Sequence, residues 1–128
     1  MAVYNEIVVL SKGKHGYDAL DNNDNFHVKQ NQNILAINLL RFQLDYGESE
    51  AIVLAIELEA DILLLDEKKA RKVAQVNSQP VIGTIGILQA AKNKNLISDI
   101  KPHLDGLIAN GFWIDKKLYQ TILQNNGE

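Results

Sequence analysis

Carboxylate side chains gather in two short stretches of the chain, and carboxylates are the residues here that could do chemistry. Glu48 and Glu50 follow Gly47 at the start of a helix-like segment, and Asp66 and Glu67 follow the hydrophobic run DILLL. Hard divalent cations such as Mg²⁺ take oxygen ligands and keep several waters, so two or three converging carboxylates anchor one. A cation held in this way activates water for phosphodiester hydrolysis. The first interpretation is therefore a metal-dependent hydrolytic site.

The same four carboxylates also have an ordinary structural interpretation. Acidic residues in the first turn of a helix favour its positive end by about 0.3–1 kcal/mol, which would account for Glu48 and Glu50. Asp66 would cap the helix that follows it. The residue types alone leave both interpretations open.

Basic residues come directly after the second acidic pair. Lys68, Lys69 and Arg71, with Lys72 beside them, form a basic turn. Lysine and arginine contact nucleic-acid phosphates, although a solvated helix face explains such runs more often. The net charge of −3 gives no overall attraction to nucleic acid. Any contact with nucleic acid must therefore be local.

The elements that position these residues follow from apolar periodicity. Apolar residues at helical spacing predict a helix over residues 48–59, and the apolar run that follows predicts a strand over residues 61–65 covered on both faces, as in a parallel sheet. The other predicted elements are helices over residues 3–10, 34–44, 67–76, from Thr84, from Ser98 to Asn110 and from Asp115, and short strands over residues 26–30 and 80–82.

This alternation of strands and helices favours an α/β fold with a parallel sheet and helices on both of its faces. The 128 residues contain neither a linker nor a repeat, which predicts a single domain over residues 1–128. The chain has no cysteine, which excludes disulfides and thiolate metal sites and fits a cytoplasmic location. No apolar run approaches the ~20 residues of a membrane span, so no membrane partner is expected.

Other motifs are weaker candidates for chemistry. The three histidines lack the spacing of metal ligands. Gly83 and Thr84 lack the GK[ST] part of a phosphate loop, so Gly83 is expected to permit a tight turn and Thr84 to cap the next helix. Phe112, Trp113 and Tyr119 are expected to pack in the C-terminal part of the core.

Three blocks of sequence together resemble a known family. GESEAI at residues 47–52, LLLDEKKAR at 63–71 and GTIGIL at 83–88 carry a similarity that extends over about residues 2–123. The chain resembles a bacterial and archaeal branch of the PIN-domain family, whose members are α/β/α sandwiches. Many PIN domains are metal-dependent ribonucleases, including the toxins of toxin–antitoxin pairs. The resemblance implies a three-layer α/β/α sandwich, RNA as substrate, and Mg²⁺ or Mn²⁺ as cofactor.

The resemblance also implies a set of site residues. Glu6 matches the acid on an early helix of the family, and Glu48, ahead of Glu50, matches the acid that opens the central helix. Asp66 matches the acid at the end of the following strand, and Glu67 its neighbour. Glu6, Glu48 and Asp66 are thus the implied catalytic metal ligands, and Glu50 and Glu67 are auxiliary. The implied phosphate contacts are Lys68, Lys69 and Arg71.

The chain departs from the family pattern at its start. A PIN domain begins with a central strand that ends in aspartate, and this sequence enters directly at the acidic helix, so it is expected to be N-terminally shortened. Glu67 is usually aspartate, and Ser78 stands where a helix-ending glycine is common. Activity is therefore expected to be impaired in an isolated monomer. The alternative is a non-enzymatic remnant or interaction module, whose exposed sheet edges favour a homodimer or an antitoxin-like partner.

Overall fold

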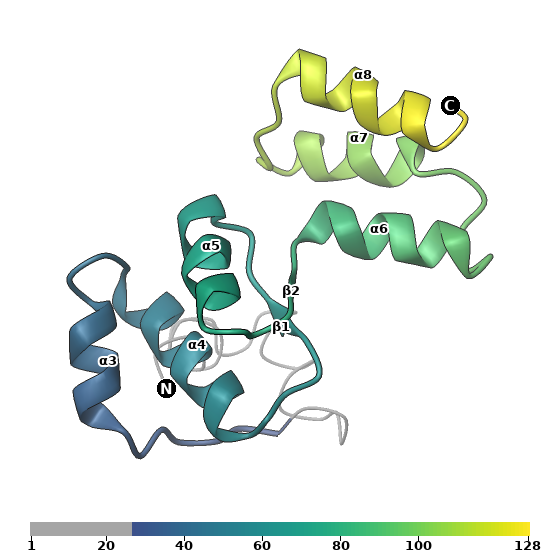
Figure 1. Ribbon diagram of the computed structural model, residues 1–128. Coiled ribbons are helices and arrows are strands. Elements are labelled where there is room, and N and C mark those ends of the chain that lie inside the picture. Colours follow the sequence, from purple (N-terminus) through teal and green to yellow (C-terminus); the bar gives the residue numbers. More distant parts are fainter. Residues whose placement is uncertain (1–26) are drawn as a thin grey trace, which may run out of the picture. The chain divides into compact units, whose positions relative to one another are not determined.

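A computed structural model describes residues 27–128 (Figure 1). The chain divides into two compact units, the first ending at Val81 and the second beginning at Ile82. The described elements follow the order α3, α4, β1, α5, β2, α6, α7, α8, which is the mixed α/β fold predicted from the sequence. A single domain over residues 1–128 stays a prediction. The helix predicted over residues 3–10 and the start of the chain lie outside the described residues.

Two helices open the described part of the first unit. α3 spans Ile34–Leu40, and the Asn33 side chain caps it by accepting a hydrogen bond from the Ala36 N–H at 3.0 Å. A turn over residues 41–43 follows, so α3 is shorter than the predicted helix over residues 34–44. α4 spans Tyr46–Glu57 and begins before Gly47, because Asp45 is its N-cap. The helix predicted over residues 48–59 therefore starts two residues earlier and includes Gly47.

The sheet of the described residues is short. β1 (Leu63–Leu64) and β2 (Val81–Ile82) pair as parallel strands, with α5 (Lys68–Val76) between them in sequence. Both strands are shorter than predicted. Residues 27–30 form no strand, and their side chains are all exposed. The alternation of polar and apolar residues there does not correspond to one buried and one exposed face. The strand predicted over residues 26–30 is thus wrong for its described part.

One apolar cluster holds the first unit together. Ile52 from α4, Leu65 after β1, and Ala70 and Ala74 from α5 pack with Leu44, and the partly buried neighbours of this cluster are Leu40, Ala51, Leu63, Val73 and Val81. Side chains alternate across a strand, so Leu63 and Leu65 reach this cluster from one face of the sheet. Leu64, on the opposite face, is more than half exposed. Within residues 27–128, this strand is therefore covered on one face and not on both, as had been predicted.

The second unit is helical beyond β2. α6 (Thr84–Asn93), α7 (Lys101–Ala109) and α8 (Lys116–Asn125) lie side by side in Figure 1. Ile100, Leu104 and Ile122 form its buried core, with Ile85 and Leu88 of α6 packed against them. This unit therefore has a hydrophobic core of its own.

The helix ends of the second unit test the predicted caps. Asp115, where the last helix was predicted to begin, caps α8 by accepting from the Leu118 N–H at 2.9 Å, and Gly111 follows α7 with φ +98°, in the left-handed region that glycine adopts at helix ends. Gly83 is the N-cap of α6 with extended backbone, φ −98°, and it joins β2 directly to that helix, as expected of a tight turn, whereas Thr84 does not cap the helix. The helix predicted from Ser98 starts later, because α7 begins at Lys101 with Ile100 as its N-cap.

The N-terminus of α7 is bound instead by a residue from the far end of the unit. The Glu128 carboxylate accepts hydrogen bonds from the backbone N–H groups of Ile100 at 2.8 Å and Lys101 at 3.0 Å, and it pairs with Lys92 Nζ at 2.8 Å. The Lys92 ammonium and the two N–H groups lower the pKa of Glu128 to about 2. One carboxylate thus joins all three helices. None of the helices within residues 27–128 is long and apolar enough to cross a membrane.

Candidate functional site

The first acidic stretch forms the start of α4. Asp45 Oδ1 accepts from the Glu48 N–H at 2.7 Å, and Glu48 Oε2 accepts from the Asp45 N–H at 3.3 Å, which makes a capping box. Ser49 is fully buried, and its Oγ donates to the Asp45 carbonyl at 2.7 Å. Glu48 is therefore part of the helix start as well as a candidate ligand. The spacing Asp45-x-x-Glu48 is the signal that would have revealed Asp45.

Glu50 differs from Glu48 in its environment. Its residue surface is only 7% exposed, whereas Glu48 is partly exposed. Asn31, which is also buried, donates from Nδ2 to the Glu50 carbonyl at 2.8 Å. This bond ties the segment before α3 to the first turns of α4. Sequence reasoning missed Asn31, because a polar NQN stretch is typical of an ordinary loop.

The second acidic stretch joins β1 to α5. Glu67, and not Asp66, is the N-cap of α5, with Glu67 Oε1 accepting from the Lys69 N–H at 3.4 Å. The expectation that Asp66 caps this helix is therefore wrong. Asp66 is exposed and makes interactions of its own. The helix-capping role that was considered for Asp66 therefore belongs to Glu67.

Arg71 fixes the backbone of this acidic turn. Its Nη1 donates to the Leu65 carbonyl at 3.2 Å and to the Asp66 carbonyl at 2.6 Å. Lys68 and Lys69 lie exposed in the first turn of α5, whereas Arg71 is partly buried. The three basic residues therefore differ: two extend into solvent, and one holds the chain at Asp66.

The two acidic stretches adjoin the same apolar cluster. Ile52 comes two residues after Glu50, and Leu65 comes directly before Asp66. Both Ile52 and Leu65 are buried in the apolar cluster of the first unit. At the opposite end of β1, the buried Gln79 donates from Nε2 to the carbonyls of Ala60 and Pro80, both at 3.1 Å. Gln79 therefore joins the start of β2 to the segment between α4 and β1.

The carboxylates of the two acidic stretches are of the right chemical type to bind a hard cation, but too few of them are brought together in the described residues. Carboxylate oxygens are the ligands that Mg²⁺ and Mn²⁺ prefer. Within residues 27–128, however, no group of three histidine, aspartate or glutamate side chains is arranged to hold a metal. Glu6, the third implied ligand, lies outside the described residues. Glu48 and Asp66 thus remain two candidate ligands from adjacent elements.

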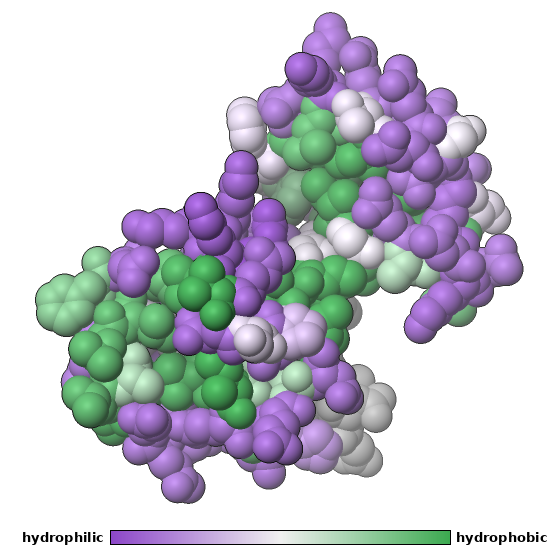
Figure 2. All heavy atoms as spheres, in the orientation of Figure 1, coloured by the Kyte–Doolittle hydropathy of each residue, from purple (hydrophilic) through white to green (hydrophobic). Residues whose placement is uncertain are grey.

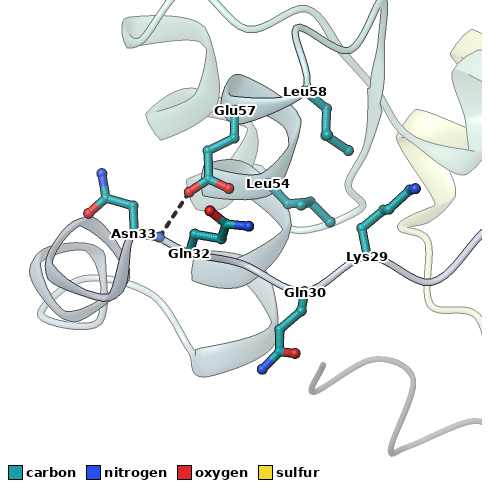
Figure 3. Close-up of a pocket in the computed structure, with 7 residues that line it drawn as sticks. All are labelled: Lys29, Gln30, Gln32, Asn33, Leu54, Glu57 and Leu58. Carbon is teal, nitrogen blue, oxygen red and sulfur yellow. Dashed lines mark hydrogen bonds between the residues drawn. The ribbon is translucent and has the colours of Figure 1, made fainter.

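A separate hollow opens between the segment before α3 and the end of α4 (Figure 3). It has a volume of about 780 Å³ and is lined by Lys29, Gln30, Gln32, Asn33, Leu54, Glu57 and Leu58. Glu57 is the single carboxylate among the described residues of this lining, and its Oε1 accepts from the Asn33 N–H at 3.1 Å. Among residues 27–128, therefore, the hollow has no pair of acids, and Glu48, Glu50, Asp66 and Glu67 do not line it.

The C-terminal aromatic residues do not behave alike. Tyr119 packs against the core of the second unit, and its hydroxyl donates to Asp105 Oδ1 at 2.5 Å. Trp113 is largely exposed, so the expectation that it packs in the core is wrong. Trp113 lies in the irregular segment between α7 and α8, where no helical periodicity indicates which side chains are buried.

Comparison with known proteins gives one result that covers the whole chain. A family model described as a PIN domain matches residues 1–128. No curated protein and no solved structure matched the chain. The match includes the three blocks that carry the two acidic stretches and the start of α6.

Proposed function

Because the chain belongs to the PIN-domain family, whose members are of nuclease type and generally use divalent metal ions, we propose that it is a Mg²⁺- or Mn²⁺-dependent ribonuclease-type protein. We further propose that its activity is low in the isolated monomer. The observation that supports this most is the position of the two acidic stretches. The start of α4 and the residue after β1 both adjoin one core, through Ile52 and Leu65. If the acids of these two elements meet beyond the carboxyl end of the sheet, they would suit a cation site.

The proposed ligands are Glu6, Glu48 and Asp66, with Glu50 and Glu67 in auxiliary roles. Asp66 is the ligand best supported by its surroundings, because Glu67 serves as the helix cap and Arg71 holds the Asp66 backbone in place. Glu48 would share its carboxylate between the Asp45 N–H and the cation. A bound cation would supply an activated water and stabilise charge on the phosphate.

Lys68, Lys69 and Arg71 are the proposed phosphate contacts. The two lysines are exposed at the start of α5, close in sequence to Asp66, where they would attract the RNA backbone. The Arg71 guanidinium has five N–H donors, and its Nη1 already donates hydrogen bonds to two carbonyls. We therefore expect Arg71 to contribute more to the position of Asp66 than to RNA affinity. RNA as substrate fits the expected cytoplasmic location.

A non-enzymatic interaction module is the second candidate. Several large apolar side chains of the first unit are exposed, including Leu35, Leu39 and Phe42, which favours a protein partner. The partners considered are a second copy of the chain and an antitoxin-like protein. In this case the carboxylates would act only as caps.

Cleavage of a labelled single-stranded RNA in the presence of Mn²⁺ tests the first proposal. We expect metal-dependent cleavage by the wild type and a loss of roughly tenfold or more in Asp66→Asn and Glu48→Gln. Glu57→Gln is the matched control, since it also removes one acid from α4 but lies at the opposite end of the helix. Cleavage that is independent of metal, or equal in all four proteins, would contradict the proposal. A folded wild type without any cleavage would favour the interaction module.

A further inference from the structure

Trp113 is an exposed aromatic residue of the second unit, in the connection between α7 and α8. It is 83% exposed, whereas its neighbours Phe112 and Ile114 are partly buried. A buried aromatic side chain removes about 150–250 Å² from water. The exposed indole ring therefore leaves a large apolar area without a packing gain.

The connection that carries Trp113 is held at both of its ends. On the α7 side, the N–H groups of Gly111 and Phe112 donate to helix carbonyls at 3.1 and 2.9 Å, which is a Schellman motif. On the α8 side, Ile114 packs against the core of the second unit, and Asp115 caps the helix. The exposure of Trp113 therefore belongs to an ordered turn of the chain.

Two lysines follow Trp113 at the start of α8. Lys116 and Lys117 are both exposed, and neither forms an ion pair within the described part of the chain. Lys92 and Lys101 of the same unit are, by contrast, each paired with a carboxylate. The ammonium groups nearest to Trp113 in sequence are thus available to an anionic ligand.

The stability of α8 does not account for these lysines. Cations favour the C-terminal end of a helix, whereas Lys116 and Lys117 lie at the positive, N-terminal end. The last turn of α8 contains no basic residue. Asp115, the carboxylate beside the lysines in sequence, accepts from the Leu118 N–H as the N-cap. Two lysines against one aspartate leave the turn locally positive.

An exposed indole ring beside cations matches the chemistry of a single-stranded nucleic acid. Unpaired bases stack on aromatic rings, and lysines attract the phosphates between them. Lys117 is four residues from Trp113, and four residues of chain span at most ~14 Å, so both lysines lie within reach of phosphates beside a stacked base. Figure 2 shows hydrophilic residues over much of the outside of the second unit, which favours this ligand over a broad apolar protein surface.

We propose that Trp113, Lys116 and Lys117 form a binding site for single-stranded nucleic acid. One base stacks on the indole ring, and the two lysines contact the adjacent phosphates. Every base has a π-face, so the site has little sequence preference. It lies in the second unit, whereas the two acidic stretches lie in the first. The site binds and does not cleave, so the inference stands or falls independently of the nuclease proposal.

The fluorescence of Trp113 reports on this site directly, because the chain contains one tryptophan. The full chain is titrated with oligo(U) and oligo(dT) of equal length, in EDTA to prevent metal-dependent cleavage. Both strands should quench the fluorescence strongly, since stacking requires only a base. An abasic strand of the same length keeps the phosphates and should quench far less. Quenching by neither base-bearing strand, by only one of them, or equally by the abasic strand would overturn the proposal.

Substitution of Trp113 tests the contribution of the ring to affinity. Trp113→Ala should raise the dissociation constant for a labelled oligo(U), measured by fluorescence anisotropy, by roughly fivefold or more. Trp113→Phe keeps an aromatic ring and should retain most of the affinity. Leu96→Ala is the matched control, since Leu96 is 74% exposed in the same unit. Unchanged affinity in Trp113→Ala, or equal losses in Trp113→Phe or Leu96→Ala, would contradict stacking at this position.

The salt dependence of oligo(U) binding tests the two lysines. Lys116→Gln and Lys117→Gln should each lower the slope of log affinity against log salt by about 0.7, the value for one contact with a single-stranded phosphate backbone. Lys94→Gln removes another exposed lysine of the second unit and should leave the slope unchanged. An unchanged slope in both Lys116→Gln and Lys117→Gln would overturn the proposed phosphate contacts.

Two further measurements exclude other occupants of the site. Poly-glutamate carries negative charge without bases and should quench Trp113 far less than oligo(U); equal quenching would assign the turn to an acidic protein and overturn the proposal. Trp113→Ala should leave the melting temperature of the free protein nearly unchanged. A large fall would mean that the ring is covered within the chain, which would also overturn it.

Discussion

Asp45 and Glu48 cap each other across the first turn of α4, with the Asp45 carboxylate on the Glu48 N–H and the Glu48 carboxylate on the Asp45 N–H. The carboxylate that the family resemblance marks as a metal ligand therefore also has a structural role. Any substitution of Glu48 will alter the helix start together with the candidate site, whereas a substitution of Asp66 leaves the Glu67 cap of α5 in place. Asp66 is accordingly the more informative position.

Removal of the Asp45 side chain should destabilise the first unit. Asp45→Ala leaves the Glu48 N–H without its side-chain acceptor, and we expect the free energy of unfolding to fall by about 0.5–2 kcal/mol. Urea denaturation followed by circular dichroism measures the change. Asp45→Asn is the matched control, since asparagine caps helices about as well as aspartate. Equal losses in both variants would contradict the capping role.

Asn31→Asp should destabilise the protein, although Asn31 lies in a polar stretch of the sequence. The substitution replaces the Nδ2 donor by an oxygen that faces the Glu50 carbonyl in a buried site, and we expect a loss of about 1–3 kcal/mol at neutral pH. Gln32→Glu makes the same change of charge at the exposed neighbouring residue and serves as the control in the same urea experiment. A loss no larger than that of the control would argue against this buried contact.

Ser78→Gly should stabilise the protein. Ser78 has φ +61°, in the left-handed region where a side chain is unfavourable and glycine is not. After the greater entropy of glycine in the unfolded chain is deducted, we expect a gain of about 0.5–1 kcal/mol. Differential scanning calorimetry measures it, and Ser98→Gly, at an exposed serine without positive φ, should give a loss instead. A lower melting temperature in Ser78→Gly would refute the expectation.

The stability of the second unit should depend on pH through Glu128. Its pKa falls from the ordinary 4.5 to about 2 on folding, because Lys92 and the N–H groups of Ile100 and Lys101 favour the charged carboxylate. A lowered pKa stabilises the fold fully above about pH 4.5, and this contribution is lost as the pH falls toward about 2. The difference in unfolding free energy between wild type and Glu128→Gln should therefore shrink over that interval.

Lys92→Met separates the two causes in the same pH series. It removes the ion pair but keeps the backbone hydrogen bonds of Glu128, so it should retain part of the pH dependence. A difference between wild type and Glu128→Gln that stays constant from neutral pH to acid would contradict the role of this carboxylate.

The features that could be predicted from the sequence are those that depend on neighbours in the chain. The apolar spacing of residues 51–58 located most of α4, and Asp115 and Gly111 marked helix ends through local backbone chemistry. The family resemblance rests on such local blocks, and the match over residues 1–128 confirms it.

The features that could not be predicted depend on residues far apart in the sequence. α7 begins at Lys101 because its first N–H groups bind Glu128, and no local signal at Ser98 reveals this. Asn31 supports Glu50 from a polar stretch without periodicity. The candidate site was predicted by its acids, but which acid caps a helix and which faces solvent depended on geometry. Asp66 was the expected cap of α5, and the structure gives this role to Glu67.

The binding of Mn²⁺ to Asp66 is the central claim, and thermal unfolding at increasing Mn²⁺ tests it directly without requiring activity. Because a ligand that binds only the folded state raises its stability, the wild type should gain several degrees at millimolar Mn²⁺. This gain should persist in Glu57→Gln and disappear in Asp66→Asn. An equal gain in Asp66→Asn, or no gain in the wild type, would contradict the proposed metal site.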